Sequence, residues 1–251
     1  MAGERAYWDE VGEQRDALPA GWRRHAAGQH VSLVRRWLGD LQGRWLKTDL
    51  YEERSEARAL LPSLRGPWWV AGDLSPTVVR RSRGAEAAPV VFDVRALPFA
   101  AGTFDGVLST STLDHFTDPA DLDRSLVELR RVLRDGGVLV LTLDNARNPL
   151  IRLRNALPRP VAARTGLVPF AVGHTVDEAG GRAALARAGF TVEEATHLLH
   201  APHVLGTRPA RFAWYEREVL PRTAALGRTR LAPWSGHFVA FLAVAVAAPR
   251  G

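Results

Sequence analysis

Cysteine is absent from this 251-residue chain, and lysine, isoleucine and methionine occur only once each. The lack of cysteine excludes disulfide bonds, thiolate metal ligands and a cysteine nucleophile, and it agrees with a cytoplasmic location. Long apolar runs are also absent, because the longest, from Phe238 to Ala248, is too short to cross a bilayer. Residues 1–30 contain no apolar core of a signal peptide. We therefore expect no membrane partner.

The scarcity of lysine draws attention to Lys47, since arginine occupies the other strongly basic positions. Arginine substitutes for lysine where only charge matters, but not where a compact ammonium group is needed. Asparagine is also rare, and its three occurrences, Asn145, Asn148 and Asn155, surround the only isoleucine, Ile151. Lys47 and this asparagine cluster are therefore candidates for specific contacts.

The chain has 33 basic and 27 acidic residues, which gives a formal net charge of +6. Such an excess is found on arginine-rich surfaces and on proteins with anionic partners. No basic run is interleaved with aromatic residues, as binding of single-stranded nucleic acid requires. We expect a small-molecule substrate rather than nucleic acid, and the sequence leaves the oligomeric state open.

Strand-like and helix-like segments alternate along most of the chain. Helical spacing of leucines and capping residues predict helices at 53–64, 75–83, 118–137 and 176–190. Apolar runs predict seven strands, at 43–50, 67–74, 89–94, 104–111, 138–145, 190–199 and 236–247. This alternation predicts an α/β fold with a mostly parallel sheet and helices on both of its faces.

No linker or internal repeat divides the chain, so we expect a single domain over residues 1–251. Within it, residues 1–43 are predicted to form an N-terminal helical cap and residues 44–145 the ligand-binding core. Residues 146–235 are rich in arginine and proline and are predicted to form a lid and substrate insertions around the sixth strand. Residues 236–251 hold the last strand.

Carboxylates stand at the ends of the second and third predicted strands, where open parallel sheets bind their ligands. Asp73 follows the first strand by about 20 residues, the offset at which a carboxylate meets ribose hydroxyls in such folds. Asp93 is followed by the apolar Val94, which suits an adenine ring and its amine. The competing interpretations are a helix-capping Asp73 and an Asx turn at Asp93.

Small polar residues, Ser109 and Thr110, end the fourth strand, and His115 follows on the next loop. An imidazole titrates near neutral pH, so His115 is the first candidate for a catalytic base and His174 the second. A structural role for a lone loop histidine is the alternative. Asn148 and Arg152, just after the fifth strand, are candidates for contacts with an acceptor or for a basic surface turn.

The segment "VVFDVRALPFAAGTFDGVLSTSTLDHFTDPADLDRSLVELRRVLRDGGVLVLTLDN", residues 90–145, resembles class I S-adenosylmethionine-dependent methyltransferases. The resemblance extends over about residues 40–145 and to the last strand. It implies a Rossmann-like seven-stranded fold with S-adenosylmethionine as the cofactor. It also implies that Asp73, with Leu74 beside it, holds the ribose, that Asp93 and Val94 hold the adenine, and that Ser109 and Thr110 line the sulfonium and methyl group.

The end of the first strand differs from that family. Family members have a glycine-rich loop after this strand, whereas residues 47–53 of this chain read "KTDLYEE". Three hypotheses compete. The turn can be rebuilt, with Lys47 on the cofactor carboxylate and Asp49, Glu52 or Glu53 facing its ammonium and sulfonium groups. Lys47 and Asp49 can instead form a structural ion pair in a protein that has lost the cofactor. The site can also bind cofactor without transferring methyl.

The resemblance implies methyl transfer to an oxygen or nitrogen of a small molecule, as in small-molecule biosynthesis. The alternatives are a protein of this fold that catalyses a non-methylating step such as a cyclisation, and a non-catalytic binding subunit. We predict no metal site, although His197, His200 and His203 are closely spaced.

Overall fold

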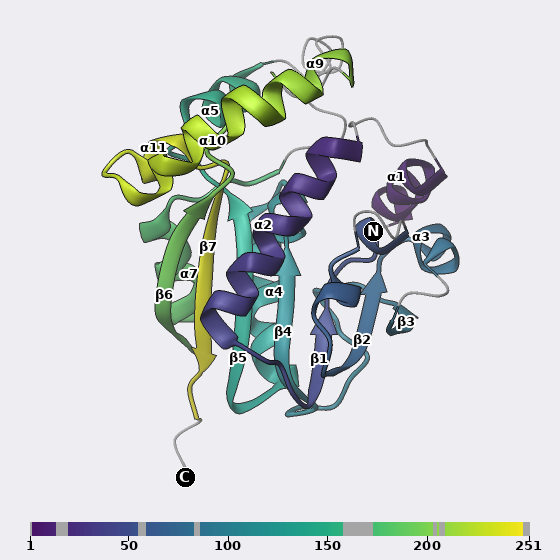
Figure 1. Cartoon of the computed structure of the whole chain (residues 1–251). Coiled ribbons are helices and arrows are strands. Elements are labelled where there is room, and N and C mark those ends of the chain that lie inside the picture. Colours follow the sequence, from purple (N-terminus) through teal and green to yellow (C-terminus); the bar gives the residue numbers. More distant parts are fainter. Residues whose placement is uncertain are drawn as a thin grey trace.

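The computed structural model describes residues 2–13, 20–54, 59–82, 86–157, 173–202, 205 and 209–247. Its centre is a seven-stranded sheet in the spatial order β3-β2-β1-β4-β5-β7-β6 (Figure 1). The strands are β1 (Arg44–Lys47), β2 (Trp68–Asp73), β3 (Ala88–Val91), β4 (Phe104–Thr110), β5 (Leu133–Asp144), β6 (Phe190–Leu198) and β7 (Phe238–Ala245). Neighbours pair in parallel, except that β7 runs antiparallel to β5 and β6. The predicted fold class is confirmed.

Helices flank the sheet and gather at one of its ends. The α-helices are α1 (Ala2–Glu13), α2 (Ala20–Leu38), α3 (Pro76–Arg81), α4 (Pro119–Val132), α5 (Pro149–Ala156), α7 (Glu178–Arg187), α9 (Pro209–Trp214), α10 (Leu220–Ala224) and α11 (Ala232–Ser235). The single turns are η1 (Glu52–Arg54), η2 (Leu61–Ser63), η3 (Leu113–His115) and η5 (Ala225–Arg228), with a π-helical turn η4 (Tyr215–Val219). In Figure 1, α5, α9, α10 and α11 lie beyond the carboxyl ends of the parallel strands.

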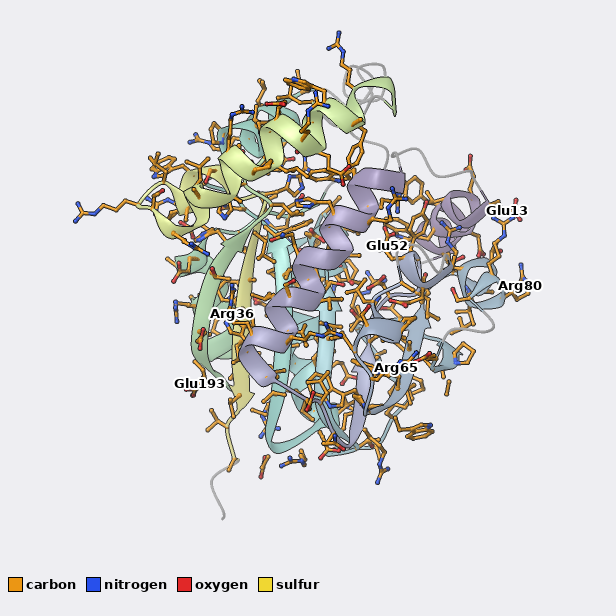
Figure 2. All side chains as sticks on the ribbon, viewed as in Figure 1. Glu13, Arg36, Glu52, Arg65, Arg80 and Glu193 are labelled. Carbon is orange, nitrogen blue, oxygen red and sulfur yellow. The ribbon has the colours of Figure 1, made fainter. Side chains whose placement is uncertain are left out.

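The two faces of the sheet bury separate hydrophobic clusters, because side chains alternate along each strand. On β4, Val107 packs with α4 and α7, whereas its neighbour Leu108 packs on the opposite face with α2. Figure 1 shows α2 crossing one face while α4 lies behind the sheet. Charged side chains such as Arg36, Arg65 and Arg80 point outward (Figure 2). The central strands are therefore covered on both faces, and their ends remain for binding.

Helix α4 begins where the sequence predicts it, but it ends at Val132 and not at residue 137, because β5 already begins at Leu133. Its N-cap is Asp118, whose carboxylate accepts a hydrogen bond from Ala120 N at 2.9 Å, and Pro119 occupies the first helical position. Its buried stripe includes Leu122, Leu126 and Leu129. This helix ends where β5 begins, so β4 and β5 become parallel neighbours by a crossover.

Two local predictions were wrong. Residues 53–64 were expected to form one helix, but they contain the short turns η1 and η2, with residues 55–58 outside the described residues. The buried carboxylate of Glu53 accepts from Leu60 N at 3.1 Å and Leu61 N at 3.3 Å, which satisfies amides that a helix would use internally. Conversely, the first part of the region expected to be irregular forms α5, which Asn148 caps.

Among the residues that the structure describes, none of the helices combines the length and apolar character that crossing a bilayer requires.

The close contact of β1 with β4 generates a stability prediction. A Cβ added at Gly106 would lie 2.5 Å from the indole ring of Trp45, so Gly106→Ala should destabilise the fold by about 1–3 kcal/mol through overpacking. Gly28, exposed within α2, has no atom within 4 Å of its added Cβ, so Gly28→Ala should be neutral or stabilise by up to about 1 kcal/mol. Urea unfolding followed by circular dichroism measures both, and equal effects would contradict the close packing.

Candidate functional site

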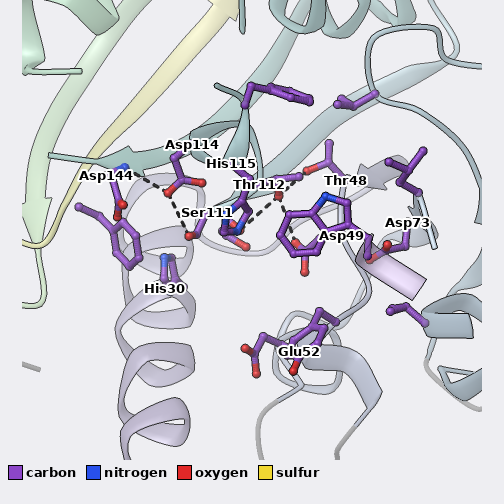
Figure 3. Close-up of a pocket in the computed structure, with 18 of the residues that line it drawn as sticks. His30, Thr48, Asp49, Glu52, Asp73, Ser111, Thr112, Asp114, His115 and Asp144 are labelled. Carbon is purple, nitrogen blue, oxygen red and sulfur yellow. Dashed lines mark hydrogen bonds between the residues drawn. The ribbon is translucent and has the colours of Figure 1, made fainter. Parts of the chain in front are cut away.

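A cavity of about 300 Å³ runs along the carboxyl ends of β2, β1, β4 and β5 (Figure 3). Its size is at the lower end of the range for small-molecule sites. The floor comes from the strand ends and the turns that follow them. The opposite wall comes from α1, through Glu4 and Trp8, and from α2. This is the sheet edge at which the sequence places the ligand.

One face of α2 contributes four residues to the cavity: Arg23, Ala26, Ala27 and His30. Their spacing of three, four and seven puts them on a single stripe. The Nδ1 atom of His30 donates to Ala26 O at 2.9 Å, and burial lowers the pKa of His30 to about 4, so its ring is neutral. The sequence prediction missed this stripe, although two polar residues seven apart around two alanines are a usable signal.

The structure brings most of the predicted ligand residues together. The cavity is lined by Asp49, Asp73, Leu74, Asp93, Val94, Thr110 and His115. Lys47 and Ser109 are fully buried and do not line it, and neither do His174, Asn148 or Arg152. The functional roles assigned to all of these residues stay predictions.

The glycine-free turn after β1 is ordered around Lys47. Its Nζ donates to the carboxylate and the carbonyl oxygen of Asp49, both at 2.8 Å, and lies 3.5 Å from Glu53 Oε1. The side chains of Lys47 and Glu53 are 0% exposed. Burial alone would lower the pKa of Lys47, but the charges of Asp49 and Glu53 outweigh it and raise that pKa. We call Lys47, Asp49 and Glu53 the buried ion cluster.

This cluster bears on the three hypotheses for the turn. Its Lys47–Asp49 contact is the ion pair of the structural hypothesis, and it places the ammonium behind the cavity wall. The carboxylate of Asp49 is 16% exposed and still lines the cavity. A cofactor contact is therefore accessible to Asp49 and, in this conformation, not to Lys47.

Asp73 ends β2 in a turn of the Asx type. Its Oδ1 accepts from Ser75 N at 2.9 Å and its Oδ2 from Leu50 N at 3.3 Å, which joins the β1 and β2 turns. Burial raises the pKa of Asp73 to about 6, and the charge of Asp49 adds to this. Each oxygen retains a lone pair for a further donor. Ser75, and not Asp73, is the N-cap of α3, so Asp73 combines an Asx-type turn with a place on the cavity wall.

Asp93 also makes the alternative Asx turn, since its Oδ1 accepts from Arg95 N at 2.9 Å. The guanidinium of Arg95 binds both Asp93 oxygens, at 2.7–3.2 Å, and reaches Glu4 on α1 and Asp121 on α4. It also lies 4.9 Å from the ring centre of Phe116. Arg95 therefore connects the β3 end of the cavity to the helix that covers it.

The β4–β5 end of the cavity holds two buried carboxylates. Asp144 accepts a hydrogen bond from Arg154 and lies 3.4 Å from His237 Nε2. Although burial alone would raise the pKa of Asp144, His237 and Arg154 together hold it below its usual range. For Asp114, burial and the charge of Asp144 outweigh the opposing effect of His115 and raise its pKa to about 6.

Two hydrogen bonds hold one carboxylate oxygen of Asp114, and the other oxygen accepts none in the described part of the chain. Its Oδ2 accepts from Ser111 Oγ at 3.1 Å and from Asp144 N at 3.2 Å (Figure 3). Its Oδ1 is buried without a hydrogen-bond partner in the described part of the chain. Ser111 has a φ of 49°, a conformation uncommon for residues other than glycine. Such unsatisfied groups and strained residues concentrate at functional sites.

Aromatic rings also line the β4–β5 end of the cavity. The ring of His30 lies 5.6 Å from that of Phe238, and His115 lies 4.9 Å from Trp8 on α1. Phe238 begins β7 and His237 directly precedes it, far along the chain, so their place at this edge comes from the antiparallel pairing of β7 with β5 and was not predicted from the sequence.

The side chain of Asn148 has a structural role. Its side-chain oxygen caps α5 by accepting from Leu150 N at 2.9 Å, and its amide donates to Ser235 O and Gly236 O. Arg152, on the same helix, is exposed. Their predicted contacts with an acceptor stay predictions.

Within the described ranges, no group of three or more histidine, aspartate or glutamate side chains is arranged to hold a metal ion. His203 lies outside the described residues. His200 donates through Nε2 to the carbonyl oxygen of His197, 3.0 Å away, so this ring nitrogen is already used within the fold.

Comparison with known proteins adds independent findings. Residues 58–141 match the family model described as a methyltransferase domain. The malonyl-acyl-carrier-protein O-methyltransferase of Geobacter sulfurreducens is 35% identical over 129 residues, 47% of this chain and 45% of that relative. The chain spans less than half the length of the curated relatives it matches.

Solved structures share the fold at low identity. A chain from the complex between the Haloferax volcanii Trm112 methyltransferase activator and a candidate methyltransferase aligns with a TM-score of 0.61 and 14% identity, covering 98% of this chain and 99% of that one. The (4+2)-cyclase SpnF aligns with a TM-score of 0.56 and 16% identity, covering 89% of this chain and 82% of that one.

The buried ion cluster predicts a structural role for Lys47 that is measurable without ligand. Lys47→Met leaves Glu53 buried without its cation and should cost about 3–5 kcal/mol of folding stability. Arg36→Met, at an exposed position on α2, serves as the matched control and should change stability by less than about 0.5 kcal/mol. Chemical unfolding measures both. An unchanged stability of the Lys47 variant, together with lost cofactor affinity, would instead favour the ligand-contact hypothesis.

The isolated carboxyl of Asp114 predicts an unusual pH dependence of stability. A carboxyl pKa raised by folding means that the folded state holds its proton more tightly, so this contribution is present below about pH 4 and lost as pH rises through about 6. Asp114→Asn should therefore gain melting temperature relative to the unaltered protein between about pH 5 and 7.5. A difference that shrinks over this interval would show that Asp114 is not the group that titrates.

Proposed function

We propose that this chain transfers a methyl group from S-adenosylmethionine to an oxygen or nitrogen of a small molecule, since residues 58–141 match a methyltransferase-domain model and the sequence resembles class I methyltransferases. The observation that carries the proposal is the cavity across the ends of β2, β1 and β4, lined by the carboxylates of Asp49, Asp73 and Asp93. The O-methyltransferase relative supports oxygen as the receiving atom.

The cavity fits the charges of S-adenosylmethionine. The cofactor carries a sulfonium, an ammonium and a carboxylate group, and it supplies the methyl group as an electrophile. Asp73 is suited to the ribose hydroxyls and the apolar wall of Phe92 and Val94 to the adenine. Asp49 offers negative charge at the glycine-free turn. Arg23, on the facing helix, forms an ion pair with Glu52, and its guanidinium is the candidate cation for the cofactor carboxylate. Lys47 holds Asp49 in place from behind.

The chain's own contribution is mainly positioning. Helices α1 and α2 cover the cavity and hold the reactants against the strand ends, and such alignment supplies up to roughly 7–11 kcal/mol in well-oriented reactions. Their cover also limits water, which strengthens every charge interaction inside. Of the two histidines that the sequence suggests as a base, His115 lines the cavity beside Trp8, whereas His174 does not.

A non-methylating activity is the second candidate. Two observations favour it: side chains replace glycines in the turn after β1, and the chain shares its fold with the (4+2)-cyclase SpnF. A cyclase of this kind would use the cavity as a template and bind the cofactor without consuming it. Cofactor binding without any methyl transfer to a panel of hydroxyl and amine acceptors would favour this candidate.

Calorimetric titration with S-adenosylmethionine and S-adenosylhomocysteine tests the cofactor site. Asp73→Ala should weaken binding of both by about 1.5–3 kcal/mol, the range for hydrogen bonds to a charged group. Asp123→Ala, which removes an exposed carboxylate of α4, is the matched control and should leave affinity unchanged. Melting curves confirm that the variants are folded. Failure of the unaltered protein to bind either compound would contradict the proposed function and favour a non-catalytic subunit.

A further inference from the structure

The cavity divides into two ends by the strands that form them. The cofactor residues proposed above stand at β2 and β1, so the sulfonium belongs near the β1–β4 boundary. The hydroxyl of Thr48, just after β1, donates to Thr112 Oγ1 at 3.1 Å, which ties that boundary to the loop carrying Asp114. The remaining end, at β4, β5 and the start of β7, is left for the methyl acceptor.

The charges at this acceptor end do not balance. Asp144 is matched by Arg154 from α5 and by His237 at the start of β7. His30, from α2, is neutral, and the closest titratable neighbour of Asp114 on its own turn is His115. No described cation forms an ion pair with Asp114 among the residues at 20–54, 59–82, 86–157, 173–202 and 209–247. His115 lowers the pKa of Asp114, but burial and the charge of Asp144 raise it by more, so the charge of Asp114 is the less compensated of the two carboxylates.

Hydrogen bonds to one carboxylate oxygen of Asp114 fix its orientation, and the other oxygen accepts none in the described part of the chain. Ser111 and the backbone of Asp144 both donate to Oδ2, so the carboxylate cannot rotate freely. Oδ1 is left without a donor, and the residue is 2% exposed while it lines the cavity. A buried, unsatisfied carboxylate oxygen is costly, and a ligand that brings an O–H or N–H group would remove that cost.

We propose that Asp114 is the catalytic residue that receives the proton of the acceptor's O–H or N–H group as the methyl group is transferred. The inference rests on the proposed function. Oδ1 of Asp114 takes the hydrogen as a proton, the acceptor atom bonds to the methyl carbon, and the electron pair of the broken carbon–sulfur bond stays on sulfur. The step leaves a neutral carboxyl group, a neutral thioether and a methylated acceptor, so atoms and charge balance.

The environment of Asp114 suits this role. A general base works best when its pKa lies near the working pH, and burial together with Asp144 raises the pKa of Asp114 to about 6. Arg154 and His237 keep Asp144 ionised, so Asp144 stabilises the proton on Asp114 without competing for it. Ser111 and Asp144 N hold the carboxylate in one orientation, as a positioned base requires.

A test that needs no knowledge of the acceptor uses sinefungin, a cofactor analogue with an amine where S-adenosylmethionine carries its transferable methyl group. S-adenosylhomocysteine lacks that group and is the reference ligand. If Asp114 faces the transferring methyl, its ionised carboxylate should pair with the ammonium, and the protein should prefer sinefungin by about tenfold or more. Because both ligands carry the same ribose, the titration of Asp73 cancels in the ratio of their affinities.

The ratio should depend on pH with a definite sign. Above pH of about 6, Asp114 is ionised and the preference is present; as pH falls through about 6, the carboxyl takes a proton and the preference is lost. Asp114→Asn should abolish the preference at every pH while S-adenosylhomocysteine still binds. Asp123→Asn, which removes a surface charge from α4, should keep both the preference and its pH dependence.

Each outcome of these titrations either supports or overturns the proposed role of Asp114. A preference that survives in folded Asp114→Asn would mean that another carboxylate, such as Asp49, meets the ammonium, and would overturn it. If the variant does not fold, the pH series on the unaltered protein decides, since a preference that is absent or does not change between about pH 5 and 7.5 overturns it. Binding of S-adenosylhomocysteine without this preference rejects the role of Asp114 alone, whereas no binding of either ligand rejects the proposed function as well.

Discussion

The cavity depends on how the turn after β1 is held, because that turn forms its floor between the β2 and β4 ends. Lys47 holds it from behind: a single buried ammonium binds the side chain and carbonyl of Asp49 and reaches Glu53. Glu53 in turn accepts from the amides of Leu60 and Leu61, which sets the course of the chain toward β2. Buried charges are tolerated only when they are paired and hydrogen-bonded, and this cluster meets both conditions. A glycine loop would approach the ligand with bare backbone, whereas this turn presents the carboxylate of Asp49.

Charge at the two ends of the cavity is organised differently. At the β2–β1 end, negative side chains are anchored by backbone amides or by Lys47 and still face the cavity. At the β4–β5 end, Asp144 is paired with Arg154 and His237, whereas burial and Asp144 outweigh the effect of His115 on Asp114. A positively charged cofactor suits the first arrangement, and an acceptor that gives up a proton suits the second. On the proposed function, the same fold would provide a binding end and a reactive end from residues on consecutive strand ends.

Parts of this site were predictable because they are local. Asp73 and Asp93 end apolar strands, and strand ends in a parallel sheet converge on one edge, so their meeting followed from order along the chain. His115 follows β4 in the same way. Lys47 stood out through composition, yet composition could not tell whether its ammonium faces a ligand or the interior. Asn148 stood out for the same reason, and it proved to cap α5 and to bind the turn before β7.

The sequence by itself determined the alternation of strands and helices, the caps of α3 and α4, the seven-stranded fold class and the resemblance to class I methyltransferases, because periodicity and capping are set by neighbours along the chain. Only the tertiary structure decided which distant side chains share the cavity. The stripe of Arg23 and His30 on α2, and His237 at the start of β7, reach it through packing across the sheet edge. Tertiary contacts also decided that Lys47 is buried and that Asp114 keeps one oxygen without a donor, since burial and pairing depend on residues far away in sequence.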